Sequence, residues 1–216
     1  MAFTANDYIV DAAELYDDTA YVRISTATWI KYLNAAVRAL ILVRPDAGAV
    51  TESVQLVAGI KQTLPAAAIR LLDISRNMGT DGATAGKIIT TSKRAHIDFS
   101  NLLWPAATGA TYVDNFAYDS TIPRIYYVTP PVHAVTAVQV EMTSSQLPTA
   151  MTVVGSDDGI EDIFFEPIGQ YMLWKAYSAD NESTEFERAK TYFSNFMSLL
   201  GVELKSSKDA GPEGKK

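Results

Sequence analysis

Cysteine is absent from this chain of 216 residues, and histidine occurs only at His96 and His133. Without cysteine the chain forms no disulfide, offers no thiolate zinc site and suits synthesis in a reducing cytoplasm. No run approaches the ~18 apolar residues that a membrane span requires. The first residues have neither a cationic region nor a hydrophobic segment, so we expect no secretory signal.

Positive charge is also scarce, because 18 Lys and Arg stand against 25 Asp and Glu, a formal net charge of −7. Such a chain is not expected to grip nucleic acid through its phosphates, but an acidic surface suits DNA that passes without binding. With 48% hydrophobic residues, the composition is ordinary for a globular protein with one sizeable core or two small ones.

Helical spacing of apolar residues dominates the first 48 residues. Residues 4–16 carry an N-cap with an acid three positions on, followed by apolar residues at helical intervals. Ser25 or Thr26 caps a second helix, which ends before Pro45 because the residue before a proline is pushed out of the helical region. Its apolar stripe consists of Trp29, Leu33, Ala36, Val37, Leu40 and Ile41.

From residue 49 to residue 152 the pattern is typical of short strands. Residues 54–65 predict a hairpin with its turn near Gly59. Further strands are predicted at 69–74, 87–91, 124–128 and 135–142, with a short helix at 95–103. Several short strands separated by turn residues predict a small antiparallel sandwich or barrel.

The helical period returns after residue 155. Residues 167–177 are apolar almost all round, which predicts a buried helix with Pro167 in its first turn. Residues 184–187 form a capping box that opens a last helix, expected to end at Gly201. Its predicted stripe is Phe186, Ala189, Phe193, Phe196, Met197 and Leu200. Residues 202–216 have almost no apolar content, so we expect a flexible, extended tail.

The organisation is therefore helices, then strands, then helices. This order predicts an α+β, mainly α, protein. Neither terminal pair of helices is long enough for a core of its own, so we expect the two pairs to pack together. Residues 1–48 and 153–201 would form one four-helix bundle, with residues 49–152 inserted as the small antiparallel β-sandwich or barrel and residues 202–216 as the tail.

The densest acidic cluster is Asp157, Asp158, Glu161 and Asp162. Such carboxylates could hold a hard cation in a metal-assisted hydrolase. Acids are also favoured at a helix N-terminus by the helix dipole. A calcium loop that starts at Asp157 would need a glutamate at its twelfth position, where the chain has Ile168. We favour the dipole interpretation.

Other candidate motifs also point away from catalysis. The glycine-rich residues 77–86 lead into a strand pattern, which indicates a hairpin tip and not a phosphate-binding loop. His96 is interpreted as a surface or capping residue. Core packing is favoured for the tryptophans, although Trp104 could serve a carbohydrate-binding or receptor-binding module. We expect no enzyme, no cofactor and no metal.

Four stretches of the sequence, in this order, resemble a family of tailed-phage head-to-tail connector adaptors. Residues 18–25 and 29–40 resemble the family's opening loop and its L-N-x-A-x-R helix, here Leu33 to Arg38. The other stretches are 42–47, then 54–65 continued by 71–79, and finally 176–180 with an acid-rich helix behind it. The resemblance spans about residues 8–200 and departs from the family's pattern around 99–108.

The resemblance implies a structural virion protein at the head–tail junction, made in the host cytoplasm and without a membrane role. It implies a homo-oligomeric ring, typically dodecameric, that joins the portal protein to a tail or nozzle protein. DNA would pass through its channel during ejection without specific binding. A head-completion or tail-completion protein of another connector layer is the alternative among structural proteins.

We expect two sets of contact residues, of which the first follows from the analogy with the family. The C-terminal segment is expected to meet the portal through Val202, Leu204, Lys205 and Lys208, since a polar tail that folds on its partner suits docking. The loop tips at 79–86 and 144–149 are expected to face the tail, through Gly79, Asp81, Gly82, Ser144 and Gln146.

Overall fold

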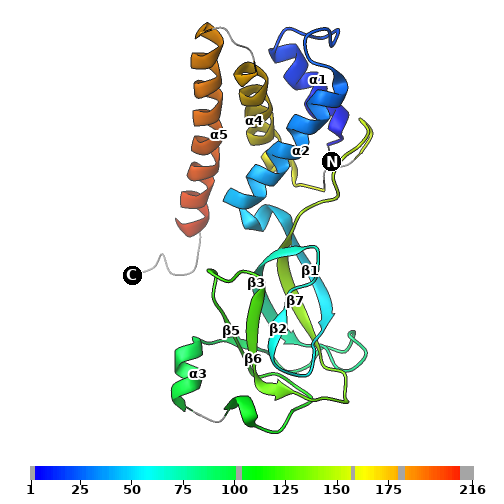
Figure 1. Cartoon of the computed structure of the whole chain (residues 1–216), viewed down its shortest axis with the longest axis vertical. Helices are drawn as coiled ribbons and strands as arrows, with labels where there is room; N and C mark the ends of the chain where they lie inside the picture. Colours follow the sequence, from blue (N-terminus) through cyan, green and yellow to red (C-terminus); the bar gives the residue numbers. More distant parts are fainter. Residues whose placement is uncertain (1–2, 101–103, 157–158, 180–182, 210–216) are drawn as a thin grey trace. The chain divides into compact units, whose positions relative to one another are not determined.

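A computed structural model describes residues 3–100, 104–156, 159–179 and 183–209 (Figure 1). The chain divides into two compact units. The helical unit comprises Met1–Ala47 and Pro148–Lys216, and the β unit comprises Gly48–Leu147. The β unit is thus an insertion between two halves of the helical unit.

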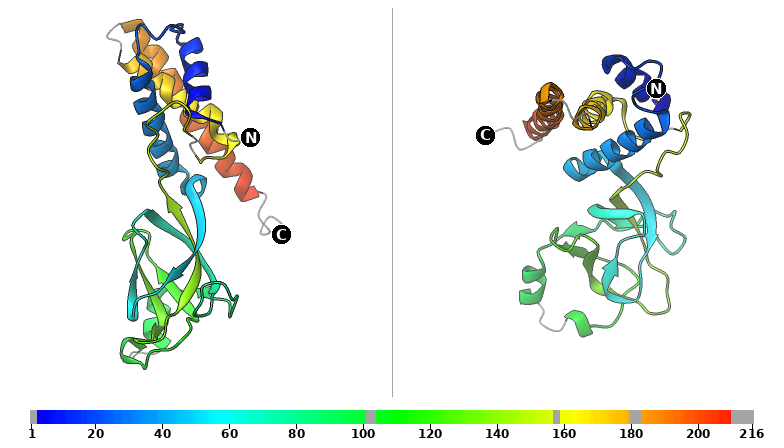
Figure 2. Two further views of the ribbon diagram at one scale, coloured as in Figure 1. Left: turned by 90° about the vertical axis from the view of Figure 1, so that its right-hand side faces the viewer. Right: turned by 45° about the horizontal axis from the view of Figure 1, so that its top comes forward.

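Four long helices build the helical unit: α1 (Ala5–Leu15), α2 (Thr26–Val43), α4 (Phe165–Ser178) and α5 (Ser183–Asp209). Figures 1 and 2 show α4 between α5 on one side and the pair α1 and α2 on the other. Among the described residues, α5 makes its extensive contacts with α4, whereas α4 also packs against α1 and α2. A closed four-helix bundle, as predicted, is therefore not what these contacts describe.

The helix ends follow from local chemistry. The backbone N–H of Thr4 donates to the Asp7 carboxylate at 2.7 Å, so the predicted cap with its acid is confirmed. Ser25 accepts from the N–H of Thr28 at 3.3 Å and caps α2. The end predicted for the last helix at Gly201 is wrong, because α5 continues to Asp209. Residues 202–209 are helical where an extended chain was expected, and residues 210–216 lie outside the described part.

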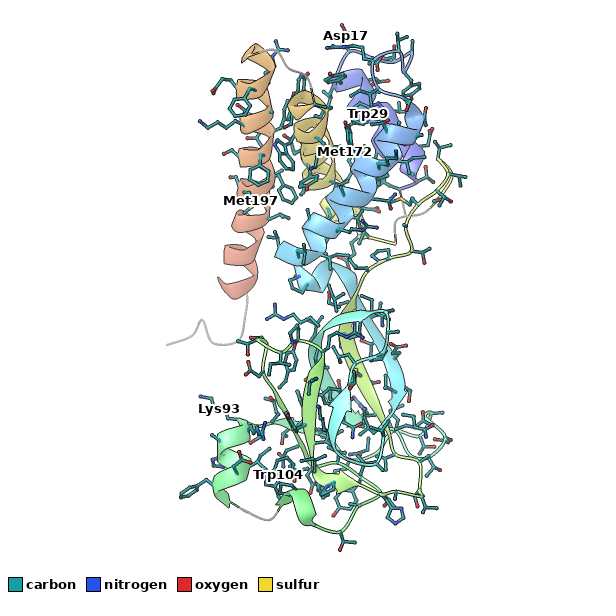
Figure 3. All side chains as sticks on the ribbon, viewed as in Figure 1. Asp17, Trp29, Lys93, Trp104, Met172 and Met197 are labelled. Atoms are coloured by element: carbon teal, nitrogen blue, oxygen red, sulfur yellow. The ribbon has the colours of Figure 1, made fainter. Side chains whose placement is uncertain are left out.

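The core of the helical unit lies where α4 meets its neighbours. Trp29 of α2 and Met172 of α4 are fully buried there (Figure 3). Burial of one such side chain contributes roughly 1.5–3 kcal/mol. The apolar stripe predicted for α2 is confirmed, since all of its residues are buried: Trp29, Leu33, Ala36, Val37, Leu40 and Ile41.

Seven strands in two sheets make up the described β unit, which confirms the mixed α+β class. One sheet has the order β1 (Ala49–Gln55), β7 (Gln139–Gln146), β3 (Ala68–Asn77). The other has the order β2 (Gly59–Thr63), β6 (Ile125–Val132), β5 (Asn115–Tyr118), β4 (Thr90–Thr91). All pairs are antiparallel except β4 with β5.

The predicted hairpin at residues 54–65 is wrong in its pairing. β1 pairs with β7 and β2 pairs with β6, so the two strands belong to different sheets. Leu56 and Leu64 both enter the core shared by the sheets, and Gly59 turns the chain with a φ of 95°. The buried Gln62 side chain donates to the carbonyl of Val57 at 2.7 Å and holds this crossing in place.

A second, smaller cluster lies against the β2–β6–β5–β4 sheet. The helix α3 (Arg94–Ser100) and the 3-10 turn η2 (Trp104–Ala106) contribute Ile97 and Trp104, which pack with Ala117 of β5. The remaining 3-10 turns are η1 (Pro45–Gly48) and η3 (Asp162–Phe164), which precede β1 and α4.

Candidate functional site

The described residues do not assemble a metal site. No group of three or more His, Asp and Glu side chains that could hold an ion occurs within them. Of the acidic cluster, Asp157 and Asp158 lie outside the described residues, while Glu161 and Asp162 are exposed near η3. None of the described helices is both long and apolar enough to cross a membrane.

Trp104 is not a ligand platform. Its side chain is 3% exposed and packs into the cluster with Ile97 and Ala117. The indole N–H donates to the carboxylate of Asp98 at 2.7 Å, so the polar edge is also occupied. The idea of a carbohydrate-binding or receptor-binding site on Trp104 is therefore wrong. His96 is exposed on α3, in agreement with its interpretation as a surface residue.

A continuous run of aromatic contacts, here called the aromatic seam, joins α4 to α5. It consists of Tyr171, Trp174, Phe193 and Phe196, with ring centroids 4.8 Å apart for Tyr171–Trp174 and for Trp174–Phe193, and 5.1 Å apart for Tyr171–Phe196. Burial raises the pKa of Tyr171. Lys175 lies with its ammonium 4.5 Å from the Trp174 ring, an attractive cation–π distance.

The apolar stripe of α5 is wider than the surface that α4 covers. Phe196 is buried, but Phe186 is 65% exposed and Met197 is 45% exposed. The predicted stripe is therefore buried only in part, because α5 packs extensively against a single helix. Phe186, Phe193 and Met197 follow one another at intervals of seven and four residues, which places them along one side of α5. We call them the exposed edge of the seam.

A structured loop connects α1 to α2. The buried carboxylate of Asp18 accepts from the N–H of Val22 at 2.8 Å, from that of Arg23 at 3.0 Å and from that of Ile24 at 2.8 Å. Burial raises the pKa of Asp18. The three backbone hydrogen bonds together lower it by more than burial raises it, so the pKa of Asp18 lies below its ordinary value. Asp17 and Tyr21 adopt positive φ angles of 58° and 54° to make this turn.

The loop displays an apolar residue beside an acidic helix. Val22 is 83% exposed at a position that the Asp18 hydrogen bonds fix. On α1, Asp7 and Glu14 are exposed together with Val10 and Leu15. We call these side chains, with Val22, the α1 face. Burial raises the pKa of Asp11 on the same helix, and the neighbouring charges of Glu166 and Glu14 raise it further.

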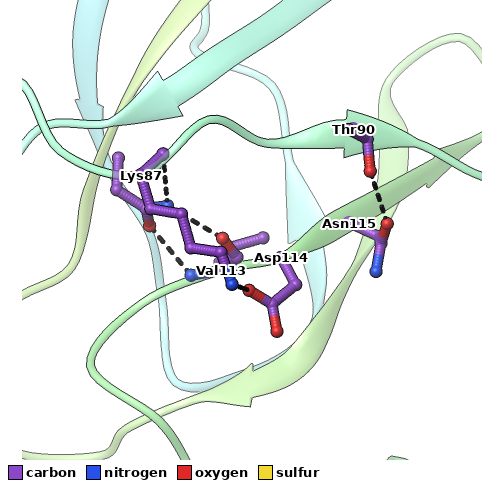
Figure 4. A network of polar contacts seen from close by, with 6 residues as sticks. Lys87, Thr90, Val113, Asp114 and Asn115 are labelled. Atoms are coloured by element: carbon purple, nitrogen blue, oxygen red, sulfur yellow. Dashed lines mark hydrogen bonds and ion pairs between the residues drawn. The ribbon is translucent and has the colours of Figure 1, made fainter.

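The glycine-rich loop after β3 is anchored at its base by Asn77, which binds Lys87 and Val113, two of the residues labelled in Figure 4. The buried Asn77 amide donates to the carbonyls of Lys87 at 2.9 Å and Val113 at 2.8 Å, and its oxygen accepts from the N–H of Val113 at 2.8 Å. Lys87 pairs with Asp114, whose side chain raises the pKa of Lys87. The base of the loop is therefore held to the segment that leads into β5.

The tip of this loop is ordered by Asp81, one of the predicted tail-facing residues. Its carboxylate accepts from the N–H groups of Ala83 and Thr84 at 3.0 Å each and from the Thr84 hydroxyl at 2.8 Å. These hydrogen bonds, led by the one from the Thr84 N–H, lower the pKa of Asp81 to about 2. Gly79 and Gly82 have positive φ angles of 64° and 72°, and a Cβ on Gly82 would collide with the Gln139 side chain.

The other predicted loop tip, residues 144–149, is wrong in part, because its first three residues belong to a strand. Ser144 and Gln146 lie within β7, and Ser144 is fully buried. Ser144 therefore presents no side chain to a partner on the surface of one copy. The predicted portal residues Val202, Leu204, Lys205 and Lys208 fall on the last turns of α5, where their side chains lie outside the described residues.

Residues of the motif stretches hold structural positions that spacing alone did not reveal. Asn34, in the helix with the L-N-x-A-x-R pattern, bonds both backbone groups of Met151 at 2.9 Å each. The buried Arg44 binds the Asp46 carboxylate at 2.6 Å across Pro45 and lies 5.5 Å from the Phe164 ring. Tyr177 stacks on Tyr192 with ring centroids 5.3 Å apart. Each motif thus fixes a turn or a helix contact.

Comparison with known protein families places these features in context. The family model described as SU10 adaptor protein, a family of phage head-to-tail adaptors, matches residues 3–214. The match covers both halves of the helical unit and the whole β unit. No curated protein matches the chain in a sequence comparison.

Proposed function

We propose a function from one premise: the chain belongs to the SU10 adaptor protein family. It is accordingly a structural adaptor protein of a phage. Beyond this, we infer that it forms a homo-oligomeric ring, the dodecamer implied by the family resemblance, at the head–tail junction of the virion. The ring joins the portal protein to a tail or nozzle protein.

The observation that carries the ring proposal is the exposed edge of the seam. Phe186, Phe193 and Met197 form an apolar strip on α5 that a single copy leaves in water. Large exposed apolar patches mark protein contacts, so three large apolar side chains along one side of a helix support a contact at this strip. A contact between two different faces of identical copies closes into a ring when the rotation allows it.

The net charge of −7 supports a channel through which DNA passes. Acidic side chains repel phosphates, so the duplex slides past the protein without specific binding. We assign the last turns of α5 and residues 210–216, including Val202, Leu204, Lys205 and Lys208, to the portal contact. We assign the ordered tip with Gly79, Asp81 and Gly82 to the tail-facing contact.

Electron microscopy of purified particles tests the proposal directly. We expect twelve copies in a ring beneath the portal, and a ring at another level of the connector would identify a head-completion or tail-completion protein instead. In a complementation experiment, a chain without residues 202–216 should leave heads without this protein while the purified variant remains folded by circular dichroism. Normal incorporation of the shortened chain would overturn the portal assignment.

A further inference from the structure

Two faces of the helical unit have complementary chemistry and lie on opposite sides of α4. The aromatic seam runs along α4 and α5, whereas the α1 face lies on α1 and on the loop that follows it. Because α4 separates α5 from the α1–α2 pair, the two faces do not cover each other within one copy (Figures 1 and 2).

We propose that the α1 face of one copy docks on the exposed edge of the seam of the next copy. This inference rests on the proposed ring and adds which two surfaces form its repeating contact. Each copy then contacts one neighbour through its α1 face and the other neighbour through its exposed edge. Contacts between two different faces of identical copies are heterologous and generate rings.

Apolar complementarity is the first support for the docking. The exposed edge offers two large side chains to water, Phe186 and Met197, beside the partly exposed Phe193. The α1 face offers Leu15 and Val22, which are 55% and 83% exposed. Aromatic residues and methionine are enriched at the centres of protein interfaces, where they fill pockets on the partner.

Charge complementarity is the second support, and it selects a second copy as the occupant. The α1 face presents the exposed carboxylates of Asp7 and Glu14, and the neighbouring guanidinium of Arg23 lies over the Tyr16 ring at 4.8 Å. The seam, by contrast, carries Lys175 over Trp174, and Lys190 lies four residues after Phe186 and seven before Met197 on the same side of α5. Opposite charges around an apolar centre fix the register of a contact.

Preorganisation is the third support. The Asp18 carboxylate holds the loop through three backbone N–H groups, so Val22 is presented in a fixed position before any partner arrives. A preformed loop loses little conformational entropy on binding. The exposed Val22 side chain is accordingly suited to pack against the exposed edge of the seam.

Cysteine cross-linking in particles tests this pairing without background from native thiols of this chain, because the chain has no cysteine of its own. A chain with both Val22→Cys and Met197→Cys, treated with a short bismaleimide, should give a covalent ladder from dimers upward. The matched control replaces Met197→Cys by Asn195→Cys, which lies two residues away on the opposite side of α5 and should give no ladder. Particles that contain the double variant but yield no ladder overturn the docking, and so do cross-links to a larger protein.

Charge reversal provides a second measurement if the cysteine pair is not incorporated. Glu14→Lys and Lys190→Glu should each reduce incorporation into particles, and the two together should restore it, whereas Glu187→Lys on the outer side of α5 should have no effect. Failure of the combined reversal to restore incorporation overturns the docking. A ring without the ladder or the rescue sinks this inference alone, while particles without any ring of the unsubstituted chain sink the proposed function.

Discussion

Asn34 binds Met151 through both backbone groups of that residue. Its side-chain amide donates to the Met151 carbonyl at 2.9 Å, and its oxygen accepts from the Met151 N–H at 2.9 Å. Met151 follows the last strand of the β unit, so this pair fixes the point at which the chain returns to the helical unit. The same amide donates to the carbonyl of Ile30 within α2.

Asn34→Ala should therefore lower the free energy of unfolding of the helical unit by about 2–4 kcal/mol, because the backbone groups of Met151 lose their partners. Urea denaturation followed by circular dichroism measures this change. Asn195→Ala, on the exposed surface of α5, is the matched control and should have little effect. A loss for Asn34→Ala no larger than that of the control would contradict the role of the pair.

Helix α5 carries the buried Phe196 and the exposed Phe186, which makes a direct comparison possible. Phe196→Ala should destabilise the protein by about 3–5 kcal/mol, since it leaves a cavity between α4 and α5. Phe186→Ala should change the free energy of unfolding by less than about 0.5 kcal/mol, because its side chain is mostly in water. Similar losses for both variants in thermal or urea unfolding would show that Phe186 is buried within one copy.

Asp81 should titrate with a midpoint near pH 2 in the folded protein, below its ordinary value of 3.8. A folded-state pKa that is lowered stabilises the loop above the ordinary pKa, and this contribution disappears as the pH falls from about 4 through 2. The carboxyl carbon resonance of Asp81 measures the midpoint by NMR. Thr84→Val, which removes only the hydroxyl donor, should raise the midpoint part of the way. A midpoint near 4 in the unsubstituted protein would refute the hydrogen-bonded tip.

Asp18→Asn should make the loop between α1 and α2 more susceptible to proteolysis. The amide retains only one of the two acceptor oxygens that bind the N–H groups of Val22, Arg23 and Ile24. Limited proteolysis with mass spectrometry should detect cleavage in residues 17–25 several-fold sooner. Asp17→Asn is the matched control, because asparagine tolerates the positive φ at that position. Equal cleavage rates in the two variants would rule out this role of Asp18.

Local patterns in the sequence were sufficient to predict the first two helices and the residues that cap them. Thr4 with Asp7, and Ser25, act through neighbours three residues away, so their caps are visible in the sequence itself. The stripe of α2 is visible for the same reason. The family resemblance, carried by residues such as Leu33 to Arg38, also indicates a phage adaptor from the sequence alone.

Local sequence patterns did not predict which residues of the candidate contact surfaces are exposed. Phe186 and Met197 fit a helical stripe as well as Phe196 does, and only the packing of α5 against one helix decides which of them stays exposed. Ser144 comes just after the alternating apolar and polar residues of the predicted strand 135–142. That pattern alone does not show whether Ser144 lies in a loop or at the end of a buried strand. The role of Asp18 depends on a loop conformation with two positive φ angles.

What the sequence by itself determined is the order of helical and strand-forming segments, the helix caps and the acidic balance, since each of these depends on composition or on residues a few positions apart. Tertiary structure alone decided that β1 and β2 enter different sheets, that Asn34 holds Met151, and that the seam keeps an apolar edge in water. Those outcomes depend on which distant segments compete for the same partner, and that competition is settled only when the whole chain packs.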